Sequence, residues 1–78
     1  MTVSRGEALA AAKKLLRTFD SAPEPTRQAR SIYSELSHAE GLSAQERSEV
    51  EALGAWLLER PRLSELKPRC AQLLAKLA

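Results

Sequence analysis

The sequence has few aromatic residues, one cysteine and few β-branched aliphatic residues. Its 78 residues include one Phe, one Tyr, one Trp and one Cys. The single cysteine, Cys70, excludes an intramolecular disulfide and fits a reducing, cytoplasmic setting. Val and Ile occupy just three positions, Val3, Ile32 and Val50, and this shortage argues against β-strands.

Features that would specify several classes of function are also lacking. No apolar run approaches the roughly 18 residues of a membrane span, and the N-terminus lacks the apolar stretch of a signal peptide. Gly6, Gly41 and Gly54 stand too far apart for a phosphate-binding loop. The sequence has one His, His38, and one Cys, and no further metal-binding side chain lies near either of them at the spacing of a metal site. We therefore expect no enzyme, metal, cofactor or small-molecule substrate.

Ala and Leu dominate what is present, and both favour helices. The apolar content of 44% is enough for one core. Apolar residues recur at helical spacing, and prolines and glycines separate the segments. The pattern predicts one all-α domain over residues 1–78, a small four-helix array with antiparallel hairpins and a short turn before the last helix. The expected helices cover about 5–19, 25–39, 44–60 and 68–77.

Two motifs predict where helices begin. Ser4 with Glu7, and Ser43 with Glu46, each have the S-x-x-E spacing of a capping box. Gly54 lies beside the core stripe of the third helix, where glycine costs about 1 kcal/mol relative to alanine. A close crossing of two helices would explain that glycine.

The last apolar pattern contains a proline, Pro68. Its apolar positions step by three or four residues, as in a helix-packing seam: Leu63, Leu66, Cys70, Leu73 and Leu77. One kinked helix could carry this seam. We instead expect a turn over 64–67 and a helix that begins at Pro68, because the first helical position tolerates proline. Cys70 is then a buried, unreactive core residue.

Charge is unevenly distributed along the chain. Residues 1–30 hold six Lys/Arg and three Asp/Glu, a net charge of +3. Residues 31–59 hold one base and six acids, a net charge of −5, and residues 60–78 hold five bases and one acid, a net charge of +4. Such blocks can pair within one fold or leave a polarised surface.

The third helix carries more apolar surface than one core face needs. Trp56 and Leu58 lie on opposite sides of its core stripe, and a tryptophan at a core rim is a frequent interface anchor. The candidate partner interface is Trp56, Leu58, Arg60, Arg62 and Leu63. We expect a small adaptor or docking domain that binds another protein or a second copy of itself as a homodimer, and that does not bind a membrane.

Nucleic-acid binding through the two basic ends is the alternative. The turn Gly41-Leu42-Ser43 resembles that of a helix-turn-helix, but the helix after it begins with three glutamates and one arginine within residues 44–51. Phosphates would repel such a helix. The basic residues left for this role are Lys13, Lys14, Arg17, Arg60, Arg62, Lys67 and Arg69.

A remote alternative is phosphotransfer through His38. Residues 36–41 resemble the segment around the phosphorylated histidine of histidine-phosphotransfer domains, which are helical bundles. That family has a lysine and then a glycine after the histidine, whereas here Gly41 takes the lysine position. The phosphorylated imidazole would face Glu35 and Glu40 instead of a cation. A histidine near a helix C-terminus is favourable without any chemistry.

Overall fold

The computed structural model describes residues 3–78. Within them the chain forms four α-helices, one 3-10 helix and two very short strands. In order these are β1 Val3–Ser4, α1 Arg5–Arg17, η1 Phe19–Ser21, α2 Pro25–Ser37, β2 Ala39–Glu40, α3 Ala44–Leu57 and α4 Leu63–Leu77. The predicted all-α, four-helix fold is confirmed.

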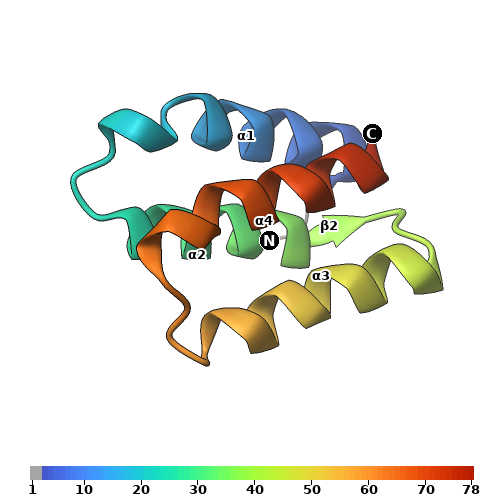
Figure 1. Cartoon of the computed structure of the whole chain (residues 1–78). Helices are drawn as coiled ribbons and strands as arrows, with labels where there is room; N and C mark the ends of the chain where they lie inside the picture. Colours follow the sequence, from blue (N-terminus) through green and yellow to red (C-terminus); the bar gives the residue numbers. More distant parts are fainter. Residues whose placement is uncertain (1–2) are drawn as a thin grey trace.

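The helices reverse direction at each connection, so neighbours in sequence run antiparallel (Figure 1). α1 packs on α2 and α2 packs on α3, whereas α4 packs against all three. In Figure 1, α1 lies above and α3 below, with α4 crossing in front of α2. The last helix therefore closes a single core, as its apolar seam predicted.

That core is almost entirely aliphatic. Its buried cluster draws residues from all four helices, and the predicted burial of Cys70 is confirmed. Leu15 and Leu16 of α1 are partly buried at its edge. The cluster comprises Leu9, Ala12, Phe19, Ala29, Ile32, Leu36, Val50, Leu53, Leu57, Leu66, Cys70, Leu73, Leu74 and Leu77.

Both predicted N-caps are present. At the start of α3 the Ser43 hydroxyl accepts a hydrogen bond from the Glu46 amide at 3.1 Å. The Glu46 carboxylate accepts one from the Ser43 amide at 2.9 Å. This complete box satisfies two amides that a helix start leaves unpaired. At the start of α1 the Ser4 hydroxyl accepts from the Glu7 amide at 3.2 Å.

Gly54 marks the close helix crossing that the sequence predicted. A Cβ built at Gly54 would lie 2.5 Å from Cε1 of Tyr33, well inside van der Waals contact. The tyrosine ring of α2 therefore rests against the bare backbone of α3. Any larger residue at position 54 would have to push this ring away.

The predicted start of the last helix is wrong. α4 begins at Leu63, with Pro68 inside the helix, rather than at Pro68 after a turn. An interior proline costs about 3 kcal/mol, but the added turn places Leu66 in the core with no exposed surface. Burial of one leucine contributes about 1.5–3 kcal/mol, which is of the same order. Leu63, expected at the head of the buried seam, is exposed instead.

The first two helices end before the predicted residues. α1 ends at Arg17, and Phe19 enters the core from the 3-10 turn η1. α2 ends at Ser37, after which β2 pairs in parallel with β1, Val3 opposite Ala39. This two-residue pairing corrects the expectation of no strands. The buried side chain of Ala39 shows why the segment leaves the helix and turns into the core.

α3 also ends early, at Leu57 instead of near Arg60. After Leu57 the α-helical bonds give way to shorter ones, from the Leu58 amide to Ala55 and from the Glu59 amide to Trp56. Arg60 then adopts φ of 55°, a left-handed conformation that cannot continue a right-handed helix. Gly41 has φ of 86° and turns the chain after β2. Its positive φ is the conformation for which glycine is suited.

Candidate interaction surface

A shallow apolar groove runs between α2 and α3. Arg30 and Tyr33 line it from α2, Gly54, Ala55 and Leu57 line it from α3, and Leu58 lines it directly after the end of α3. The Tyr33 ring occupies the space beside Gly54, and next to it Ala55 has only a methyl group. The result is an open hollow of about 520 Å³, large enough for aliphatic side chains from outside.

Leu58 stands at the rim of this groove and is the most exposed large apolar residue that the structure describes. Its exposure is 78%, and that of Leu63 is 61%. A single exposed leucine is ordinary on a protein surface. Here the leucine adjoins a hollow that is itself apolar, and such a combination is typical of a binding surface.

The connection from α3 to α4 continues the surface with cations. Arg60 and Arg62 are both exposed and lie between the two exposed leucines in sequence. Among residues 3–78, Arg30, Arg60 and Arg62 have no carboxylate partner. Their guanidinium groups are therefore available to a ligand. Glu59 is the acid of this connection.

The five residues predicted as an interface do not form one patch. Leu58 faces α2, whereas Trp56 lies on the opposite side of α3 and packs partly buried against the core near α4. The guanidinium carbon of Arg69 sits 5.1 Å from the centre of the Trp56 ring, within cation–π range. Trp56 thus belongs to the α3–α4 contact, while Leu58, Arg60, Arg62 and Leu63 remain exposed.

Sequence reasoning missed the α2 side of the groove. Arg30 gives no signal in the sequence, because only the packing of α2 on α3 brings it beside Leu58. A signal for the groove itself was available in the small pair Gly54-Ala55 three residues before Leu58. Tyr33 is partly buried and packs against the core.

The basic residues considered for nucleic-acid binding are partly engaged within the fold. The Lys67 ammonium lies 2.7 Å from the Asp20 carboxylate, and Arg69 covers Trp56. Lys13, Lys14 and Arg17 are exposed along α1. Two of the seven basic residues that were considered for phosphate binding therefore already have partners in the protein.

His38 is an exposed residue at the C-terminus of α2. Its Nδ1 lies 2.7 Å from the Ser34 carbonyl oxygen, so the ring caps the end of its own helix. Within residues 3–78 no three His, Cys, Asp or Glu side chains are grouped as a metal site requires. Burial raises the pKa of the Cys70 thiol to about 11, which suppresses the reactive thiolate.

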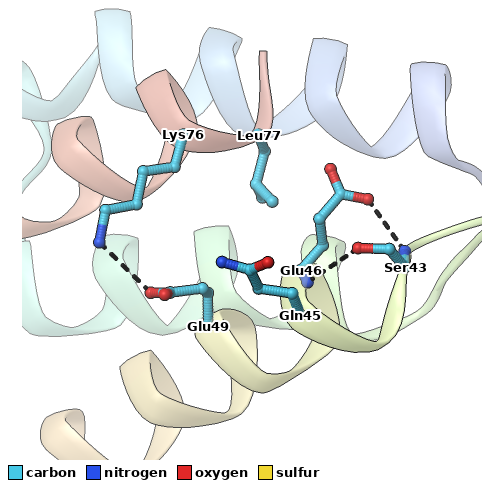
Figure 2. Close-up of a pocket in the computed structure, with 6 residues that line it drawn as sticks. All are labelled: Ser43, Gln45, Glu46, Glu49, Lys76 and Leu77. Carbon is cyan, nitrogen blue, oxygen red and sulfur yellow. Dashed lines mark hydrogen bonds and ion pairs between the residues drawn. The ribbon is translucent and has the colours of Figure 1, made fainter.

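Figure 2 shows a second hollow, between the start of α3 and the end of α4, lined by polar and charged side chains together with Leu77. Ser43 and Glu46 bond each other there, and Lys76 lies 3.5 Å from Glu49. Its charged groups are thus already paired with each other or with neighbouring residues. We therefore interpret it as a contact between helices, called the joint below, and not as a ligand site. Gln45 and Leu77 complete the lining.

Arg5 holds this joint together from a third helix. Its guanidinium donates to Glu46 at 2.6 Å and to the Leu77 carbonyl oxygen. The hydrogen bond from Arg5, with that from the Ser43 amide, lowers the pKa of Glu46 from 4.5 to about 2. The same carboxylate raises the pKa of Arg5. Sequence reasoning did not find this link, because its partners are 41 and 72 residues away from Arg5.

No protein family, curated protein or solved structure matches this chain. Among the helices of residues 3–78, none has the length and apolarity to cross a membrane.

Proposed function

We propose that this domain is a non-catalytic docking module that binds another protein through the groove between α2 and α3. The observation that carries the proposal is the exposed Leu58 at the rim of an apolar hollow floored by Gly54 and Ala55. Protein interfaces concentrate their binding energy where apolar anchors meet such pockets. A cytoplasmic setting, inferred from the single buried thiol, is part of the proposal.

Other described features support docking over chemistry. The polar hollow of Figure 2 has its charged groups paired, and His38 serves as a helix cap. Cys70 is buried with a raised pKa, so it is a poor nucleophile. The groove, by contrast, combines apolar lining with cations that lack partners.

Affinity capture with two charge-matched variants tests the proposal. Leu58→Glu places a charge on the groove rim, and Ala10→Glu adds the same charge at an exposed position on α1. Proteins captured by the wild-type domain should be retained by Ala10→Glu and lost with Leu58→Glu. A partner retained by both variants would show that docking does not use this groove.

A further inference from the structure

We propose that the groove between α2 and α3 receives an acidic amphipathic helix from a different protein. This segment presents aliphatic side chains on one face and carboxylates beside them. The inference rests on the proposed docking function and specifies the chemistry of the partner.

The shape of the groove favours a helix as the occupant. The groove follows two packed helices, and a third helix can lay a ridge of side chains between them. Its floor consists of Gly54 and Ala55, with Tyr33 on one side and Leu57 and Leu58 on the other. Aliphatic anchors spaced three or four residues apart lie on one face of a helix and would fill such a hollow.

The charges around the groove favour an acidic occupant. Arg30 lies in the lining itself, and Arg60 follows Leu58 by two residues, so its Cα is within about 7 Å of the rim. Arg62 follows two residues later. With Glu59 and with Glu51, which lies two helical turns before Leu58 on the same face of α3, this surface carries a net charge of +1. Carboxylates beside the aliphatic anchors would complement it and speed association.

The same charges disfavour a second copy of this chain as the occupant. A two-fold contact brings identical patches together. Arg30, Arg60 and Arg62 of one copy would then face the same three cations of the other. The chain's own acidic helix, α3, is also a poor occupant, because two of its three glutamates, Glu46 and Glu49, are already paired with Arg5 and Lys76, which leaves Glu51 alone. The homodimer expected from sequence therefore stays a separate prediction.

Two designed peptides test the partner class directly. Each has about 14 residues, or four helical turns, with leucines at i, i+4 and i+7. The remaining positions hold Glu and Ala in one peptide, and Lys and Ala in the other. Titrations followed by NMR on isotope-labelled protein should show the acidic peptide perturbing Gly54, Ala55 and Leu58. The lysine peptide should bind at least about tenfold more weakly.

Matched charge reversals separate groove binding from general attraction. Arg30→Glu should weaken the acidic peptide by about tenfold. Arg17→Glu makes the same change at an exposed residue of α1, which lies across the molecule from α3, and should have little effect (Figure 1). Equal binding of both peptides, equal effects of both variants, or shifts confined to other helices would each overturn the inference.

Two further measurements exclude other occupants. Sedimentation of the wild type and of Leu58→Glu should show no Leu58-dependent self-association. Vesicles of phosphatidylserine and phosphatidylcholine should not capture the domain through Leu58. A positive result in either assay would overturn the acidic-helix assignment. The capture experiment above stands independently, since Leu58-dependent capture of a protein supports docking even if neither peptide binds.

Discussion

Gly54 is the residue on which the groove depends. It lets the Tyr33 ring approach the α3 backbone. Beside it Ala55 has only a methyl group, so the groove stays open at this point. A glycine in a helix interior costs about 1 kcal/mol relative to alanine. The close crossing at this position offsets that cost.

We expect Gly54→Ala to destabilise the wild type, because its Cβ would meet the Tyr33 ring at 2.5 Å. Overpacking of this kind costs about 1–3 kcal/mol, which exceeds the propensity gain of about 1 kcal/mol. In a Tyr33→Ala background the same substitution should stabilise by about 1 kcal/mol. Chemical denaturation of the four variants measures the coupling, and additive effects would mean that the two residues do not compete for space.

Cys70 should react slowly with thiol reagents in the folded protein. Burial raises its pKa from 9.0 to about 11, so the thiolate fraction at neutral pH is about a hundredfold lower, before any loss of access is counted. Labelling rates in buffer and in denaturant give the comparison. Similar rates in the two conditions would place Cys70 outside the core.

At the scale of single elements, local sequence determines where helices begin more firmly than where they end. The capping boxes are short-range, and both predicted starts are present. Helix ends depend on neighbours, since α2 ends where Ala39 pairs with Val3. The start of α4 was predicted wrongly because the burial of Leu66 is of the same order as the cost of an interior Pro68, and the helix begins at Leu63 with the proline inside it.

Ser43→Ala should destabilise the domain by about 1 kcal/mol, because the Glu46 amide loses its acceptor. Ser48→Ala is the matched control, since Ser48 is an exposed residue inside the same helix. Denaturant midpoints of the two variants test the prediction. Equal midpoints for Ser43→Ala and Ser48→Ala would show that the cap contributes little.

Over the whole molecule, Arg5 connects the beginning of the chain to its end. One guanidinium bonds Glu46 at the start of α3 and the carbonyl of Leu77 at the end of α4. A cation at a helix C-terminus and an anion at a helix N-terminus are each favoured by the helix dipoles. Three helices are thereby joined at one side chain.

This joint predicts an acid-sensitive stability. The folded-state pKa of Glu46 is about 2, below its ordinary 4.5, so the unfolded chain binds its proton more readily. The contribution is present above pH 4.5 and is lost as pH falls toward 2. Glu46→Gln should therefore flatten the loss of stability across this window. Glu59→Gln is the control, and thermal melts from neutral to acid pH provide the measurement.

An acid response unchanged by Glu46→Gln would mean that other carboxylates dominate acid unfolding. An equal change in Glu59→Gln would point to the overall charge of the protein. Only a change specific to Glu46 supports the joint with Arg5.

The sequence by itself determined the helical class, the four segments, the two capped starts and the close crossing at Gly54. The first three depend on propensity or on residues within one or two helical turns, so a linear pattern contains them. The crossing, whose partner Tyr33 lies in α2, showed in the sequence only as a glycine inside a helix. The exposure of Leu58 could also be predicted from the sequence, because helical spacing places Leu58 off the core stripe.

Only the tertiary structure decided which of these residues share a surface. Trp56 and Leu58 are two positions apart in sequence, yet α4 covers one and α2 leaves the other exposed. Arg30 joins the groove, and Arg5 reaches Glu46 and Leu77, solely because helices distant in sequence pack together. Contacts of this kind depend on the arrangement of whole helices around one core, and no local pattern specifies that arrangement.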